Sequence, residues 1–78
     1  MITEEDVTRF AEIRRDMEDI VRKASVSRVG FTPLMRRATG EPCDYAPIFG
    51  DIIRMARMVA ADIDYAMERA KWATSKRN

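Results

Sequence analysis

Proline and glycine are concentrated in one short stretch of this 78-residue chain. All three prolines and two of the three glycines lie within residues 30–47. These two residue types interrupt helices and favour turns, whereas the segments on either side contain mostly good helix formers. The sequence therefore predicts two long helices joined by an irregular middle segment.

The first segment has the pattern of an amphipathic helix over residues 4–24. Thr3 is placed to cap this helix, and Asp6 stands three residues later, in the position of a capping-box partner. Apolar residues recur at intervals of three and four, which places them on one helical face. These residues are Val7, Phe10, Ile13, Met17, Ile20, Val21 and Ala24.

The last segment predicts a helix over residues 47–75, with Pro47 at its first position. Its apolar residues cover an arc of roughly 160°, whereas a single neighbouring helix needs about 100°. We therefore expect this helix to be covered on two sides, in part by a second copy of the chain. The residues expected at the oligomer interface are Ile52, Ala56, Val59, Ala60, Ile63, Ala66, Met67 and Ala70.

The middle segment is too long for a structureless loop in a compact domain. Thr32 and Pro33 have the pattern of a helix cap and first helical residue, and Gly40 that of a helix stop. These signals predict a short helix over residues 33–39. The expected fold is all-α: a single domain, residues 1–78, in which a long antiparallel helical hairpin with a short intervening helix oligomerises into a helical bundle.

A chain of this length has a small core, which rarely supplies more than about 3–5 kcal/mol. Cys43 is the single cysteine and histidine is absent, so the sequence excludes an internal disulfide and disfavours a zinc site. Self-association is the remaining common means of stabilisation. We expect a homodimer or a higher oligomer.

The composition is that of a globular protein, with 46% hydrophobic and 35% charged residues. No apolar run is long enough to cross a bilayer, and the N-terminal residues do not resemble a secretion signal. A single unpaired cysteine suits a reducing compartment. We expect a cytoplasmic protein without a membrane partner.

Catalytic residues are not evident in the sequence. Without histidine, the hydroxyl and thiol side chains lack the base that usually activates them: Ser25, Ser27, Thr32 and Cys43. Glycine-rich phosphate loops and calcium loops are also missing. We expect no enzymatic activity, no metal and no cofactor.

Three residues spaced by seven form a candidate partner-binding ridge on the last helix: Met58, Tyr65 and Trp72. Arg54 and Arg69 flank this ridge. Tyrosine, tryptophan and arginine are enriched at binding hot spots, and methionine adapts well to varied partners. The alternative is that the middle segment or a second subunit covers the ridge.

A second candidate site lies in the middle segment. Arg28, Arg36 and Arg37 lie near the predicted short helix, and Thr32 adds a hydroxyl at its N-terminus. Such groups can hold a phosphate or a carboxylate. The alternative is that these arginines pair with acidic residues of the first helix or remain solvated.

Three classes of function remain. The first is an interaction protein that binds a partner protein stoichiometrically, as a regulator, inhibitor or adaptor of the kind phages and mobile elements encode. The second is an oligomeric binder of anionic ligands, either nucleotides or nucleic acid. The third is a structural assembly subunit. The C-terminal residues Ala66-Met67, Trp72-Ala73 and Arg77-Asn78 are similar to those of phage proteins that sequester cyclic oligonucleotides, but the match is too short to assign a family.

Overall fold

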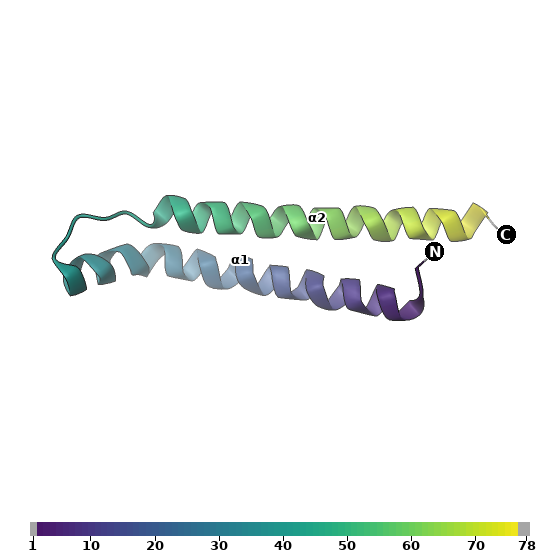
Figure 1. The fold of residues 1–78 in the computed structure, drawn as a ribbon, viewed down its shortest axis with the longest axis horizontal. Helices are drawn as coiled ribbons and strands as arrows, with labels where there is room; N and C mark the ends of the chain where they lie inside the picture. The colour runs from purple at the N-terminus through teal and green to yellow at the C-terminus, as the bar shows by residue number, and fades with distance from the viewer. Residues whose placement is uncertain (1, 77–78) are drawn as a thin grey trace.

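The computed structural model of the chain is a hairpin of two long antiparallel helices (Figure 1). Helix α1 spans Glu4–Thr39, and helix α2 spans Ala46–Lys76. The structure describes the backbone of residues 2–76 and the side chains of residues 2–71. Over that part all regular structure is helical, which confirms the predicted all-α hairpin. We call the end with the connecting loop the closed end, and the other the open end.

The N-terminus of α1 has the predicted capping box. The Asp6 amide donates to the Thr3 hydroxyl over 3.1 Å, and the Thr3 amide donates to the Asp6 carboxylate over 3.0 Å. The first turn is acidic and the last turn is basic, so charges at both ends of α1 complement the helix dipole. Local sequence signals are therefore sufficient to place this end of the helix.

The separate short helix predicted over residues 33–39 is wrong, because α1 continues without a break to Thr39 with Pro33 in its interior. Proline lacks an amide hydrogen, so the carbonyl four residues earlier, on Val29, loses its usual helical partner. Val29 is 81% exposed, which allows water to reach that part of the helix. The predicted stop is confirmed at Gly40, which has φ 70° and donates its amide to the Arg36 carbonyl over 2.9 Å.

Thr32 supports the other helix of the hairpin. Its side chain is buried, and its hydroxyl accepts a hydrogen bond from the Tyr45 amide over 2.8 Å. Tyr45 directly precedes α2, and its carbonyl accepts from the Phe49 amide over 3.1 Å. The prediction that Thr32 caps its own short helix is therefore wrong, because the hydroxyl fixes the N-terminus of α2.

Two further polar contacts hold the connecting loop. The Arg36 guanidinium donates through Nε to the Cys43 carbonyl over 2.9 Å. The Asp44 carboxylate accepts from the Ala46 amide over 3.0 Å, which satisfies one of the unpaired amides at a helix N-terminus. The last turns of α1 are thus bonded to the loop that follows them.

Aromatic rings pack the closed end together. The ring of Phe31 meets the rings of Tyr45 and Phe49 edge to face, with centroid distances of 4.9 and 5.6 Å. Such pairs contribute about 0.5–1.5 kcal/mol beyond their buried area. These contacts between α1 and the start of α2 help to offset the cost of Pro33 inside the helix.

Replacing Thr32 tests its role at the closed end. Thr32→Val should lower the free energy of unfolding by about 1–3 kcal/mol, because the Tyr45 amide loses its acceptor while the side-chain shape is kept. Thr32→Ser keeps the hydroxyl and should cost only about 0.8 kcal/mol for the lost methyl group. Urea denaturation followed by circular dichroism measures both. A smaller loss for valine than for serine would contradict the role of this hydrogen bond.

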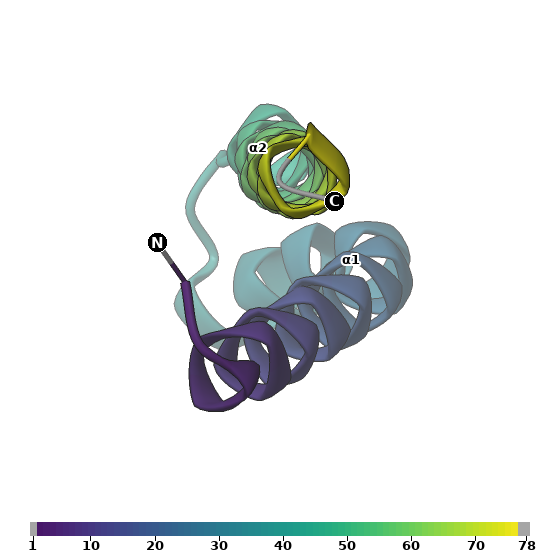
Figure 2. The same cartoon turned by 90° about the vertical axis from the view of Figure 1, so that its right-hand side faces the viewer.

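The hairpin is long and thin, and it forms a single layer when viewed along its axis (Figure 2). Its extents are 64 × 18 × 14 Å and its radius of gyration is 18.2 Å. A compact chain of this length would have a radius of gyration of about 11–12 Å. The buried apolar residues are correspondingly few: Ala24, Ile53, Ala56 and Ile63 among the described side chains.

Candidate interaction surfaces

One side of the hairpin carries an ion pair between the two helices. The Arg14 guanidinium donates through Nε and Nη2 to the two carboxylate oxygens of Asp64, over 2.7 and 3.1 Å. This bidentate geometry is the strong form of such a pair. Arg14 also pairs with Glu18 on its own helix. A shallow groove of about 370 Å³ runs along this side, with Arg57 among its lining residues.

This ion pair makes the stability of the hairpin depend on pH. The hydrogen bond from Arg14 holds the pKa of the Asp64 carboxyl below its ordinary value of 3.8. A carboxyl with a lower pKa in the folded state stabilises that state fully above its unfolded pKa. The stabilisation is lost as the pH falls through the lower, folded pKa.

Asp64→Asn should therefore flatten the acid branch of the stability profile. Because both partners are well exposed, the loss of stability at neutral pH should be small. The urea midpoint between about pH 2 and pH 6 is the appropriate measurement. A double-mutant cycle with Arg14→Gln isolates the coupling between the two side chains. An unchanged pH profile in Asp64→Asn would contradict the assigned pair.

The same ion pair shows which sides of the two helices lie together. At about 100° per residue, Arg14 lies about 80° around α1 from the buried Ala24. Asp64 lies about 80° around α2 from the buried Ala56, in the same rotational sense. These two side chains meet on one side of the hairpin. Residues displaced in the opposite sense on either helix must therefore lie together on the other side.

That other side is apolar, and the hairpin does not cover it. Five large side chains lie there, displaced by about 40–100° from Ala24 or Ala56 in the opposite sense. Their exposed fractions range from 38% to 53%. We call them the open face: Ile20 and Leu34 on α1, and Ile48, Met55 and Val59 on α2.

The predicted oligomer-interface residues divide between these two sides of α2. Five lie on the side that contacts α1, where they are buried or half-buried: Ala56, Ala60, Ile63, Met67 and Ala70. Three lie toward the open face: Ile52, Val59 and Ala66. Ile52 and Ala66 are half-buried and Val59 is exposed, so a single chain covers the open-face part of the apolar arc only in part.

The predicted ridge on α2 points away from α1. Met58 and Tyr65 are 56% and 66% exposed. Both lie about 160–180° around α2 from the buried Ala56, so they belong neither to the open face nor to the ion-paired side. The side chain of Trp72, the third predicted member, lies outside the described residues. Met58 and Tyr65 are thus accessible to an external partner in the single chain.

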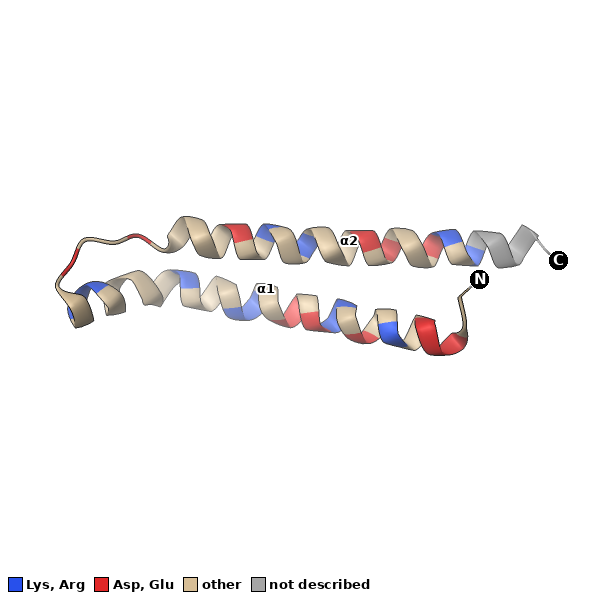
Figure 3. Ribbon diagram, in the orientation of Figure 1, with Lys and Arg blue, Asp and Glu red and all other residues tan. Residues whose placement is uncertain are grey.

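Charged groups of both signs surround this ridge. The Arg69 guanidinium lies 6.0 Å from the centre of the Tyr65 ring, and Arg54 pairs with Asp51 over 3.3 Å. Figure 3 shows basic and acidic residues interspersed along both helices. The ridge therefore has the mixed polar surroundings typical of a protein-binding surface.

The predicted anion-binding residues do not converge within one chain. Arg36 donates to the Cys43 carbonyl, and the Thr32 hydroxyl accepts from the loop. Because α1 is continuous, Arg37 lies about 180° around it from Arg28. Three guanidinium groups arranged in this way do not surround a single phosphate.

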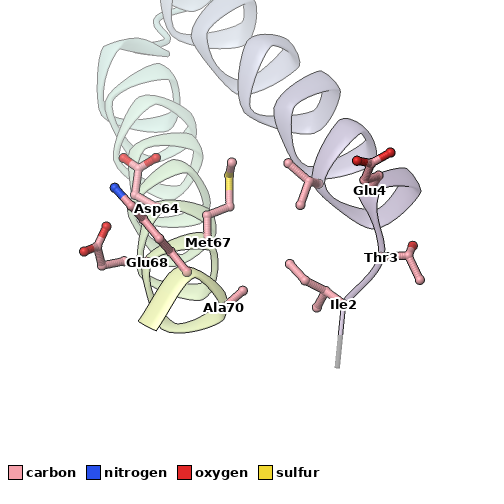
Figure 4. Close-up of a pocket in the computed structure, with 9 residues that line it drawn as sticks. Ile2, Thr3, Glu4, Asp64, Met67, Glu68 and Ala70 are labelled. Carbon is pink, nitrogen blue, oxygen red and sulfur yellow. The ribbon is translucent and has the colours of Figure 1, made fainter. Parts of the chain in front are cut away.

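A groove of about 590 Å³ lies at the open end, where the helices separate (Figure 4). Ile2 and Met67 face each other across it. Charged residues line it as well: Glu4, Asp64, Glu68 and Lys71. Among the described residues, no group of three acidic, cysteine or histidine side chains is arranged to hold a metal ion. The groove has the character of an apolar gap between helix ends.

Comparison with protein-family models, curated proteins and solved structures finds no significant match to this chain. Over the residues that the structure describes, neither helix has the length and apolar character needed to span a bilayer. The functional interpretation therefore rests on the geometry of the surfaces of the protein.

Proposed function

We propose that this protein is a small non-enzymatic helical interaction protein that binds a partner protein stoichiometrically, as a regulator, inhibitor or adaptor. Its working form is an oligomer of hairpins. The open face supports this proposal, because it gathers large apolar side chains from both helices on one side of the molecule. Large exposed apolar patches on soluble proteins mark interaction sites.

The accessible surface of the single chain gives the scale of this interaction. It measures 6366 Å², whereas a compact monomer of 9.0 kDa would expose about 4,900 Å². The difference is about 1,500 Å² per chain, and a standard interface buries about 800 Å² on each partner. The exposed excess is therefore large enough for an extensive interface.

The two surfaces on α2 can serve two different contacts. The open face is wide, apolar and shared by both helices, which suits contact between hairpins. The ridge of Met58 and Tyr65 is narrow and flanked by charged groups, which suits a partner protein. In the proposed arrangement, the oligomer forms through one surface and the partner binds the other.

Affinity capture from the native host tests this function. Immobilised native protein should retain one partner in a fixed ratio, and Tyr65→Ala should lose that partner by at least about tenfold while the oligomer mass stays unchanged. Val29→Ala is the matched control, because Val29 is exposed on α1, away from the ridge. Failure to retain any protein, or equal retention by Tyr65→Ala, would contradict the proposal.

The binder of anionic ligands is the second candidate. It has less geometric support, because the three arginines do not converge in one chain. Its signature would be binding of nucleotide or nucleic acid that weakens steeply as salt is raised. That result, with no retained protein, would favour the second candidate over the first.

A further inference from the structure

We propose that a second copy of this chain covers the open face in a two-fold dimer whose hairpins run antiparallel, with the two loops at opposite ends. The two-fold axis runs across both helices, along the open face, at the level of Ile20 and Val59. This inference rests on the oligomeric form proposed above and adds the partner, the surface and the orientation. It follows from the register of the two helices and from the charges at the rim of the open face.

The ion pair fixes the register within one hairpin. Arg14 contacts Asp64, so these two residues lie at about the same height along the hairpin. Because the helices are antiparallel and have the same rise per residue, any two residues whose numbers add up to about 78 also lie at the same height. Ile20 and Val59 are therefore nearly level with each other. They also lie near the middle of the stretch where the two helices overlap, which makes them the centre of the open face.

A two-fold axis at this centre brings apolar groups together on both helices. Ile20 meets Ile20 of the second copy, and Val59 meets Val59 of the second copy. On either side of the axis along α2, Ile52 of one chain lies opposite Ala66 of the other. A large side chain facing a small one fills space without overpacking. The face is thus self-complementary along α2.

Charges at the rim favour antiparallel over parallel copies. On α1, Asp16 and Lys23 lie on the outer rim of the open face, on opposite sides of Ile20 along the helix. A two-fold axis at Ile20 places Asp16 of each chain near Lys23 of the other. These are two pairs of opposite charge, and such complementarity fixes the register between helices.

A parallel arrangement, with the axis along the helices, would bring like charges together. Each α1 would then lie against α2 of the second copy at the same level. Asp16 would be level with Asp62, and Arg9 level with Arg69, because both pairs of numbers add up to about 78. Like charges placed opposite each other disfavour a docking arrangement.

The available area is sufficient for a stable dimer. The excess of about 1,500 Å² is spread over the whole elongated chain, and a standard interface needs only about 800 Å² of it from each copy. In the antiparallel dimer the two α2 helices lie side by side. Both ridges of Met58 and Tyr65 then lie on the same outer surface, where one partner can contact both.

The native cysteine allows a direct measurement of the arrangement. Cys43 is the single cysteine and lies in the loop at the closed end. A spin label on Cys43 of each chain measures the distance between the two loops by double electron–electron resonance. The antiparallel dimer predicts about 50 Å, at 1.5 Å per residue from the axis, and the parallel dimer predicts less than about 25 Å. Because Cys43 is half-buried, a label there could disturb the loop. The variant Glu41→Cys with Cys43→Ser therefore provides a second label site, at an exposed position of the same loop.

The outcomes separate this inference from the function on which it rests. A distance near 50 Å at both label sites supports the antiparallel dimer. A short distance overturns the antiparallel arrangement and leaves the oligomeric form standing. A monomeric mass together with no dipolar signal overturns both.

Discussion

Val59→Glu should dissociate the proposed dimer at concentrations where we expect the native protein to be fully dimeric. Val59 lies beside the proposed two-fold axis, so the variant would place two carboxylates close together in an apolar interface. An uncompensated buried charge costs about 3–5 kcal/mol. Since each 1.4 kcal/mol is a factor of about ten, the dimer dissociation constant should rise by about 100- to 4,000-fold. Sedimentation equilibrium measures this change.

Met58→Glu is the matched control for this experiment. Met58 is the preceding residue and is more exposed, at 56% against 40% for Val59. It points away from both α1 and the open face, so the same charge placed there should leave the dimer mass unchanged. Dissociation by Met58→Glu but not by Val59→Glu would show that the open face is wrongly assigned.

Ile63→Ala should remove a large part of the stability of the fold. Ile53 and Ile63 are the large apolar side chains that the described part of the hairpin buries between its helices. Truncation of a buried isoleucine to alanine costs about 2–5 kcal/mol. A domain of this length has a total stability of about 4–12 kcal/mol. Urea denaturation should therefore show a much lower midpoint for Ile63→Ala and for Ile53→Ala.

Val29→Ala provides the comparison for these core variants. Val29 is a β-branched side chain on α1 with an exposed fraction of 81%. Its truncation should change the free energy of unfolding by no more than about 0.5 kcal/mol. If Ile63→Ala were no more destabilising than Val29→Ala, the contact between α1 and α2 could not be what holds the hairpin together.

The helix ends could be predicted because their signals are local. The capping box at Thr3 and Asp6 needs only four consecutive residues, and the stop at Gly40 needs only a residue that accepts a positive φ. Both predictions are confirmed. The same local rules also marked Thr32 and Pro33 as a helix start, and there they failed.

The failure at Thr32 has a tertiary cause. The partner of its hydroxyl is the Tyr45 amide, thirteen residues away, and the Phe31 ring packs against the rings of Tyr45 in the loop and Phe49 in α2. These contacts outweigh the local preference of Pro33 to begin a helix. A signal for continuity was nevertheless present in the sequence. The alternating three- and four-residue spacing of the first helix continues unshifted from Ala24 through Ser27, Phe31, Leu34 and Ala38.

The candidate surfaces were predictable only in part. The width of the apolar arc on α2 indicated that two sides need cover, and the single chain covers one of them. The sequence did not show which residues belong to which side, because it does not fix the rotation of α2 about its own axis. The contact that fixes this rotation joins Arg14 and Asp64, which are fifty residues apart.

Thermal unfolding of the native protein tests most directly the proposal that a second copy of the chain completes the fold of a single hairpin. Circular dichroism should follow the transition over about a hundredfold range of protein concentration. If a second copy completes the fold, the midpoint rises with concentration, because association stabilises the folded state by mass action. A cooperative transition whose midpoint does not change with concentration would contradict the dimer and show that one hairpin folds on its own.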